Sequence, residues 1–226
     1  DDISLKAIAT IDNPYVQERK TNIYLRHLNI TEERLSSLLS IIDSGDINIA
    51  ESIGDCSLNG EAEFTGQEIK GDFRAETKNG YITANAKYKN NGHFNITANG
   101  NDINIGNLTK IAEPLTCSLH TDASGYLNKG EAKVQLSGTI TDLKSSKYTY
   151  SPIEFSGEYE TEANHLKARV KTEDPGLTAQ MNLDYTNDNQ HRAILSLDVD
   201  SITPCRIGLY EDMEETFSFN FDSELT

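Results

Sequence analysis

Apolar and polar residues alternate along most of the chain, and Lys, Glu, Asp, Thr, Asn and Gln fill the polar positions. The alternating stretches are Leu58–Phe64, Ile69–Ala75, Ile82–Tyr88, Phe94–Ala98, Ala132–Ile140, Ile153–Tyr159, Leu166–Val170, Leu177–Tyr185 and Ala193–Val199. A period of two gives each strand one apolar face and one polar face that points to solvent, which is typical of antiparallel sheets. The pattern predicts a mainly β fold of long, amphipathic antiparallel strands.

Turn residues separate these stretches. Asn79-Gly80, Asn91-Gly92 and Lys129-Gly130 are hairpin signals, and Asp174-Pro175-Gly176 combines a fixed φ with a permissive glycine. Alternation also follows Asp1-Asp2 directly and recurs at Phe217–Phe221. We therefore expect a meander of hairpins that is an internal fragment of a longer protein.

One segment has helical spacing instead. Its apolar residues stand at i, i+3, i+4 and i+7: Leu35, Leu38, Leu39 and Ile42. Thr31 is a suitable N-cap, and Glu32 and Glu33 suit the positive end of the helix dipole. The sequence predicts a helix over Thr31–Asp43.

A longer unit recurs along the chain: a strand, a turn, a second apolar pair and then a helical turn. The apolar pairs are Leu28/Ile30, Ile103/Ile105 and Val199/Ile202, and helical turns are expected after them at 31–43, 108–111 and 204–209. This self-similarity suggests stacked modules. With no linker rich in Pro, Gly or Ser, we expect one continuous unit over 1–226, with approximate repeats 1–44, 45–112 and 113–210.

Composition narrows the classes of function. The 226 residues carry 20 Lys and Arg against 36 Asp and Glu, a net charge of −16. Nucleic acids and anionic lipid headgroups bind to basic protein surfaces, and so acidic a chain lacks one. We therefore expect no nucleic-acid partner. Cys56, Cys117 and Cys205 match no zinc, redox or disulfide spacing and are expected to be small core residues.

The search for catalytic motifs gives nothing specific. Gly66–Gly71 is followed by Asp72 rather than by Lys and Ser or Thr, so it is not a phosphate-binding loop. The five histidines are isolated from one another along the chain. We expect no enzyme activity, no metal and no cofactor. The abundance of carboxylates is the only feature that favours the alternative, an enzyme built on a β scaffold.

The apolar face of so broad a sheet needs a cover. A second sheet, a groove formed by the sheet's own curvature, or lipid could each provide it. Gly60, Gly71, Gly138 and Gly157 fall on the apolar face, where strand glycines mark bends or close approaches. They favour a groove, whose expected lining is Leu58, Phe64, Ile69, Phe73, Ile82, Tyr88, Phe94, Ile96, Leu136, Ile140, Phe155, Tyr159, Val170, Met181 and Leu183.

Three stretches, Ile23–Leu39, Phe94–Ile111 and Val134–Leu143, resemble the AsmA-like and TamB (translocation and assembly module) family of Gram-negative envelope proteins. The resemblance implies a taco-shaped β groove in the periplasm, within a protein anchored in the inner membrane. It also implies a role in outer-membrane biogenesis, with phospholipid or nascent outer-membrane protein as cargo and an outer-membrane barrel protein as partner.

Two hypotheses from different classes follow. In the first, the chain is a non-enzymatic scaffold that shields acyl chains or nascent strands. An acyl chain of about 15 carbons needs roughly 12 kcal/mol of replacement environment outside a bilayer, which favours a continuous trough over isolated pockets. In the second, the chain is a closed β-sandwich that acts as an adhesin-like or protein-interaction module. The two differ in whether the apolar side chains are open or enclosed.

Overall fold

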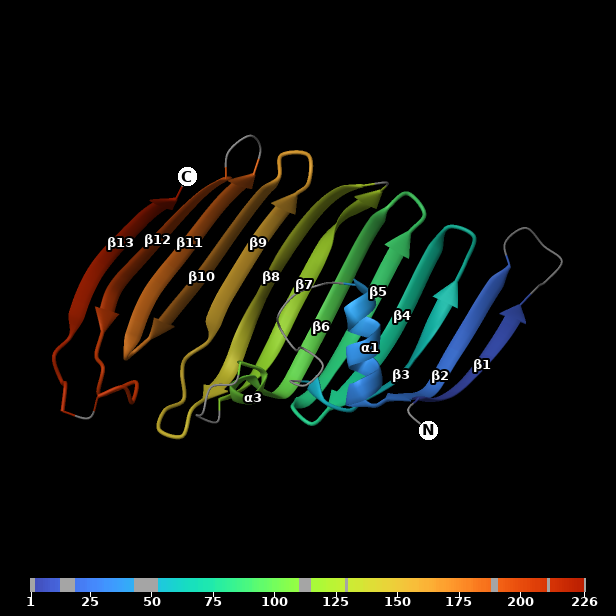
Figure 1. Ribbon diagram of the computed structural model, residues 1–226, viewed down its shortest axis with the longest axis horizontal. Coiled ribbons are helices and arrows are strands. Elements are labelled where there is room, and N and C mark those ends of the chain that lie inside the picture. Colours follow the sequence, from blue (N-terminus) through green and yellow to red (C-terminus); the bar gives the residue numbers. More distant parts are fainter. Residues whose placement is uncertain are drawn as a thin grey trace.

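A single antiparallel sheet dominates the computed structural model, which describes residues 3–12, 19–42, 53–109, 115–128, 130–187, 191–210 and 212–225 (Figure 1). Its strands are β1 (Ile3–Asp12), β2 (Lys20–Ile30), β3 (Cys56–Phe64), β4 (Glu68–Thr77), β5 (Gly80–Lys89), β6 (His93–Asn104), β7 (Thr116–Asn128), β8 (Glu131–Lys144), β9 (Ile153–Glu160), β10 (His165–Asp174), β11 (Leu177–Asn187), β12 (His191–Ile202) and β13 (Phe217–Leu225). The helices are α1 (Glu32–Ile42) and α3 (Ile105–Thr109). The predicted fold class is confirmed.

Each strand pairs with its neighbours in sequence, so the sheet is a continuous meander from β1 to β13. The glycine turns occur where the sequence predicts them. Gly80 and Gly92 have φ of 113° and 90°, a region that glycine adopts without strain. Pro175 and Gly176 form the two-residue turn between Asp174 and Leu177, which are paired. Lys129 lies outside the described residues.

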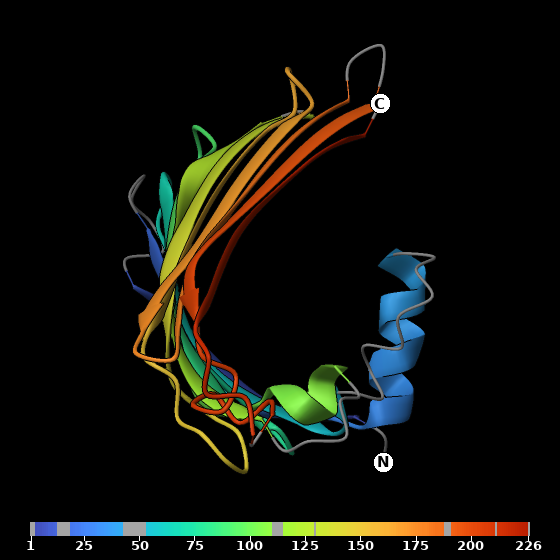
Figure 2. The same ribbon diagram turned by 90° about the vertical axis from the view of Figure 1, so that its left-hand side faces the viewer.

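The sheet is strongly bent along its strands, so that its cross-section is a C that opens on one side (Figure 2). We call the strand ends near Ile30, Cys56 and Asn104 the lower rim, and those near Phe64 and His93 the upper rim. Register shifts occur in six strand pairs of the described residues, and each lies toward the lower rim. Because β-bulges bend strands and increase their twist, they account for the tighter curve there.

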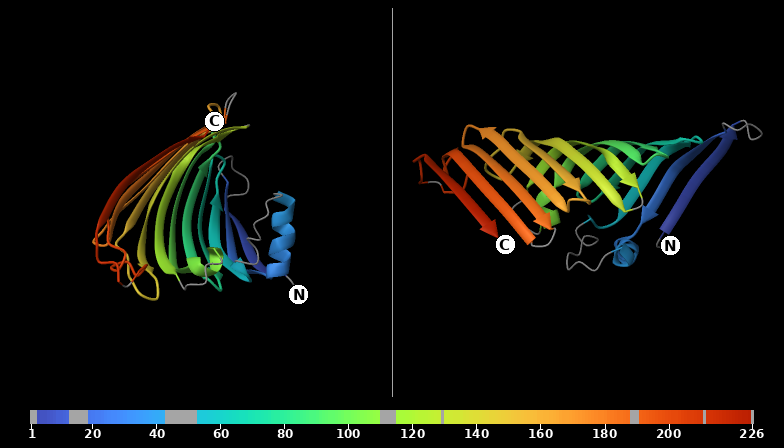
Figure 3. Two further views of the ribbon diagram at one scale, coloured as in Figure 1. Left: turned by 60° about the vertical axis from the view of Figure 1, so that its left-hand side comes forward. Right: turned by 90° about the horizontal axis from the view of Figure 1, so that it is seen from above.

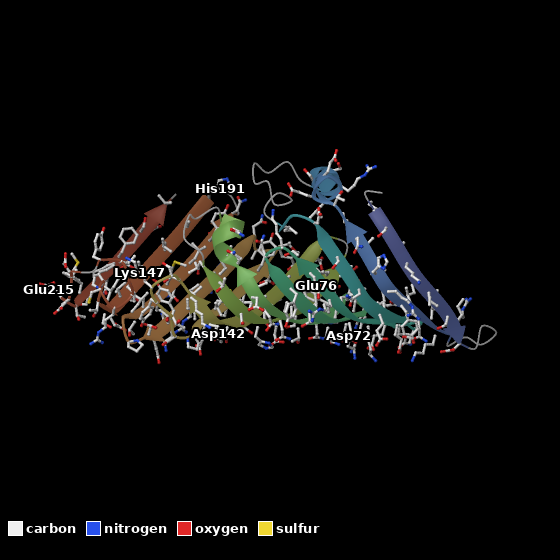
Figure 4. All side chains as sticks on the ribbon, turned by 90° about the horizontal axis from the view of Figure 1, so that it is seen from below. Asp72, Glu76, Asp142, Lys147, His191 and Glu215 are labelled. Carbon is white, nitrogen blue, oxygen red and sulfur yellow. The ribbon has the colours of Figure 1, made fainter. Side chains whose placement is uncertain are left out.

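The two faces differ in polarity. Phe73 pairs with Gly60 and Ala84, whereas its neighbour Asp72 pairs with Glu61 and Asn85. Side chains of directly paired residues share a face, so apolar and polar rows alternate across the sheet. Asp72 lies on the side away from α1 (Figure 4). The apolar rows therefore line the concave face, on which α1 and α3 stand (Figures 2 and 3).

The helix predicted at Thr31–Asp43 is confirmed as α1, and Asp43 lies outside the described residues. Thr31 occupies the N-cap position, since its carbonyl accepts a hydrogen bond from the Leu35 N–H at 2.9 Å. The Glu32 N–H donates instead to Oδ1 of Asp55, at 2.9 Å. A distant carboxylate thus caps the helix and ties its first turn to the start of β3.

Two other expectations need revision. The second helical turn is present as α3, but it begins at Ile105, where Oδ1 of Asn104 accepts the Asn107 N–H at 3.0 Å. The third prediction, a helical turn over 204–209, is wrong. That segment is a series of turns, in which Arg206 N–H donates to the Thr203 carbonyl and Gly208 N–H to that of Cys205. Gly208 has a φ of 76°, a left-handed conformation that ends a run of helical residues, so the turns do not extend into a helix.

Burial is sparse for a chain of this size. Among the described residues, the buried apolar side chains are Phe94, Cys117, Val199 and Ile207. No second sheet covers the apolar face in this part of the chain, so the expected alternative of a closed sandwich is not the observed fold. No described helix is long and apolar enough to cross a membrane.

Candidate functional site: an apolar groove

The concave face carries four long rows of apolar side chains, each row running across the strands from β1 toward β13. The registers place the fifteen residues predicted to line a groove in these rows: Leu58, Ile82 and Ile140; Phe73, Phe155, Val170 and Met181; Ile96, Leu136 and Leu183; Phe64, Ile69, Tyr88, Phe94 and Tyr159. All fifteen therefore share one face. With strands about 4.8 Å apart, the face extends for about 60 Å along the sheet.

Much of this apolar surface is open. Seven of the fifteen residues are exposed, namely Ile69, Ile82, Tyr88, Ile96, Leu136, Tyr159 and Met181, and Ile82 is the most exposed at 42%. Of the others, Phe94 is buried and the rest are half-buried. A contiguous apolar face of this extent exceeds the patches that monomeric soluble proteins usually expose and marks a binding surface.

Aromatic rings lie next to glycines of neighbouring strands. A Cβ built at Gly60 would lie 2.9 Å from Cδ1 of Phe73, and one at Gly125 would lie 3.1 Å from Cε1 of Phe94. The rings fill space that side chains at these glycines would take, an arrangement known as aromatic rescue. This packing smooths the concave wall and holds its large rings in place.

The lower rim is closed by packed segments. Asn79, buried in the β4–β5 turn, accepts the Asn104 N–H at its carbonyl and the Asn107 side-chain amide at Oδ1, which fixes α3 to the sheet. Asp174, also buried, accepts hydrogen bonds from the Tyr148 hydroxyl and from the Ser151 and Gly176 N–H groups, at 2.6 to 2.7 Å.

This carboxylate cluster joins the β8–β9 loop to the β10–β11 turn. Burial raises the pKa of Asp174, but its hydrogen bonds outweigh that effect, and the pKa lies below its ordinary value. The hydrogen bond to Asp174 raises the pKa of Tyr148 to about 12. Ile207, from the turns after β12, packs against Gly176 and completes this closed end.

The upper rim is built differently. The turns described there are short: Thr65–Gln67 between β3 and β4, Asn90–Gly92 between β5 and β6, and Thr161–Asn164 between β9 and β10. In Figure 2 no helix stands at this end. The groove therefore has one closed long rim and one rim of plain hairpins.

The outer face is polar. Asn85 donates to Asp72 at 2.7 Å and Thr97 to Asp122 at 2.6 Å. A surface depression of about 660 Å³ lies on this face over β7–β12 and is lined mainly by polar side chains such as Asp122, Gln135 and Arg169. It lacks the continuous apolar wall of the concave side, so we place the site in the groove.

Other chemistry is sparse among the described residues. Within them, no group of three or more His, Cys, Asp or Glu side chains could hold a metal ion. Cys117 is buried and Cys56 and Cys205 are half-buried, and all three are free thiols. Burial raises the pKa of the Cys56 and Cys117 thiols, which makes them less reactive. The cysteines therefore act as small packing residues, as the sequence predicts.

Comparison of the chain with protein-family models, curated proteins and solved structures found no match. The resemblance to TamB and AsmA-like proteins therefore stays a prediction.

Proposed function

We propose that the chain is a non-enzymatic segment of a TamB- or AsmA-like envelope protein that shields phospholipid acyl chains in its apolar groove. In this proposal the segment works in the periplasm and supports outer-membrane biogenesis by shielding acyl chains from water while they cross the periplasm. An outer-membrane barrel protein is its proposed partner at the receiving membrane.

The observation that carries the proposal is the open, continuous apolar wall. Leu136, Ile82 and Met181 stand on different parts of it, yet each leaves more than a third of its surface exposed. Each CH₂ group that moves from water onto such a wall gains up to about 0.8 kcal/mol. A wall crossing thirteen strands can sustain this contact along a whole acyl chain, whereas an isolated pocket cannot.

An acyl chain fits this wall better than a nascent protein strand does. The groove presents side chains, whereas the backbone groups of its interior strands already pair within the sheet. A strand lying in the groove would leave its N–H and C=O groups without partners, at a cost of about 1–3 kcal/mol for each group desolvated. Hydrocarbon carries no such groups. We therefore favour lipid over nascent strands as the cargo.

The outer face suits a protein that works in water. Glu68 pairs there with Lys70 and Lys87 at 2.7 and 2.9 Å, and the hydrogen bonds from these lysines lower the pKa of Glu68. Exposed pairs of this kind add little stability, but charge keeps the surface hydrated. The net charge of −16 opposes flat adsorption onto anionic bilayers, and this favours transfer of single chains over permanent membrane docking.

Native mass spectrometry of protein purified without detergent tests the proposal. We expect adducts with the masses of phospholipids, and a matched sample of Leu136→Asp protein should carry far fewer. A chain that stays folded but never carries lipid, even after incubation with phospholipid vesicles, would contradict the proposal.

A further inference from the structure

The groove-side residues nearest the upper rim form a row that differs from the rows below it. Each member pairs directly with the next, and the row consists of Thr21, Phe64, Ile69, Tyr88, Phe94, Gly125, Val134, Tyr159, Leu166, Tyr185, Ala193 and Leu225. We call it the upper-rim row. It holds Tyr88, Tyr159 and Tyr185, whereas the three lower rows, over the residues that the structure describes, hold no tyrosine.

The three tyrosines stand at the edge of the groove. Tyr88 and Tyr159 are 38% and 40% exposed, and Tyr185 is half-buried, with its hydroxyl hydrogen-bonded to Nδ1 of His191 at 3.1 Å. Tyrosine is amphipathic, because its ring packs on apolar surface while its hydroxyl forms hydrogen bonds. In membranes the same property concentrates tyrosine at the level of the lipid headgroups. The upper-rim row therefore has the chemistry of a headgroup boundary.

Two tyrosines of the lower rim, by contrast, have structural roles. The Tyr148 hydroxyl donates to Asp174 at 2.6 Å, and the Tyr150 hydroxyl donates to the Ile207 carbonyl at 3.3 Å. Tyr210 is exposed, but it lies in the turns after β12 and belongs to no row of the groove. Packed segments close the lower rim, whereas plain hairpins form the upper rim (Figure 2). A polar headgroup at the upper rim would therefore stay in contact with water.

The depth of the apolar wall suits an acyl chain that runs along the strands. Successive groove-side residues of one strand lie about 6.7 Å apart, so the four rows span about 20 Å. One leaflet of a bilayer holds its acyl chains in about 15 Å, half of the hydrocarbon thickness. A chain that starts at the upper-rim row therefore ends near the lowest row, that of Leu58, Ile82 and Ile140, without leaving the wall.

We propose that phospholipids bind the groove in one orientation, with their glycerol-ester and phosphate oxygens at the upper rim and their acyl chains directed along the strands toward the lower rim. The hydroxyls of Tyr88 and Tyr159, and the Tyr185–His191 pair, form hydrogen bonds with these oxygens. The inference rests on the proposed function and adds to it the position and orientation of the cargo.

The spacing of the tyrosines suits several lipids side by side. Tyr159 on β9 and Tyr185 on β11 are two strands apart, or about 10 Å, and Tyr88 on β5 is four strands from Tyr159, or about 19 Å. Each tyrosine therefore serves a separate stretch of the rim, and one headgroup contacts one or two of them.

Removal of the hydroxyls tests the inference. A triple variant, Tyr88→Phe with Tyr159→Phe and Tyr185→Phe, keeps the rings, and Tyr24→Phe, at a 42% exposed tyrosine of the outer face, is the matched control. Fluorescence titrations use a phosphatidylcholine with one pyrene-labelled acyl chain, and pyrenyldecane, which carries the same label without a headgroup. We expect the triple variant to bind the phosphatidylcholine about three- to tenfold more weakly, the effect of roughly one hydrogen bond. Its affinity for pyrenyldecane, and both affinities of the control, should match the parent.

Crosslinking from the headgroup tests the orientation itself. A phosphatidylcholine analogue with a diazirine in its headgroup is irradiated while bound to the parent protein, and mass spectrometry locates the adducts. We expect adducts in the upper-rim segments 64–69, 88–94 and 159–166, and none in the lower-rim segments 77–80, 104–109 and 174–177. Equal yields at both rims, or equal phosphatidylcholine affinities of the triple variant and the parent, would overturn the orientation but leave the groove standing. A parent that binds neither phosphatidylcholine nor pyrenyldecane would contradict the proposed function itself.

Discussion

The ring of Phe155 on β9 lies over Gly138, its cross-strand partner on β8: a Cβ built at Gly138 would lie 2.5 Å from Cζ of Phe155 and 2.3 Å from the His120 carbonyl oxygen. Neither neighbour can yield easily, since one is a packed ring and the other is backbone. The relationship shows how the concave wall accommodates large side chains on a sheet that bends toward them. The aromatic ring occupies the volume that a side chain on the paired glycine would otherwise fill.

Gly138→Ala should therefore destabilise the protein by about 2 kcal/mol through overpacking. Gly157, on the same face of the adjacent strand, is the matched control, because a Cβ there would approach only the Lys167 carbonyl oxygen, at 3.3 Å. Gly157→Ala should change the free energy of unfolding by less than about 1 kcal/mol. Urea unfolding of the two variants makes the comparison. Equal effects would contradict the packing described for Phe155.

Leu136→Asp distinguishes an open groove from an enclosed core. Leu136 is 40% exposed, so an aspartate there stays in contact with water and should cost less than about 2 kcal/mol of unfolding free energy. The same change should abolish fatty-acid uptake, because a charge would interrupt the apolar row. Ser137→Asp, on the outer face, should leave uptake intact. Outright unfolding of Leu136→Asp would indicate a buried core instead.

Asp174→Asn should destabilise the protein by about 2 kcal/mol at neutral pH, since the charged carboxylate accepts three hydrogen bonds in a buried site. Because the pKa of Asp174 is lowered in the folded protein, its contribution is present above the ordinary pKa of about 4 and is lost as the pH falls through the folded value. Urea titrations at a series of acidic pH values should show a shallower loss of stability in the variant. Parallel curves for variant and parent would show that this carboxylate does not couple to folding.

For Tyr148 we expect the opposite dependence, a loss of stability as the pH rises into the alkaline range. Its pKa is raised to about 12, so the stability it adds is fully present below its ordinary pKa of about 10 and is lost as the pH rises toward 12. Tyr148→Phe should therefore lower stability at pH 8 and flatten the alkaline limb of the stability curve. The tyrosine absorbance near 295 nm, followed in the parent and the variant, reports the titration. An unchanged slope between pH 10 and 12 would contradict the assignment.

The alternation of residues predicted nearly every strand and the shared face of the fifteen groove residues, because a period of two fixes which side chains point together. Strand β7 was not predicted: its groove-side positions include Thr121, Ala123 and Gly125, whose small or polar side chains give no apolar signal. These small residues are required by the rings beside them, such as Phe94 over Gly125. The alternation within one strand cannot predict this packing of a ring against a glycine, because it depends on which strands are paired and in which register.

The difference between the lower and the upper rim could not be predicted from the alternation of residues either. The lower rim depends on contacts between distant segments, for example Asn79 with Asn107 and Tyr150 with the Ile207 carbonyl. The sequence indicated helical turns near this rim but did not indicate that a buried carboxylate, Asp174, joins the β8–β9 loop to the β10–β11 turn. Such contacts depend on the register and curvature of the whole sheet.

Photocrosslinking at alternating positions tests the central claim most directly. A benzophenone amino acid placed at Ile82, Leu136 or Met181 lies on the concave wall, and at Thr83, Ser137 or Asn182 it lies one residue away on the outer face. After incubation with phospholipid vesicles and irradiation, we predict lipid adducts at the first three positions and none at the second three. Adducts of equal yield on both faces, or none at any position, would contradict an acyl-chain groove.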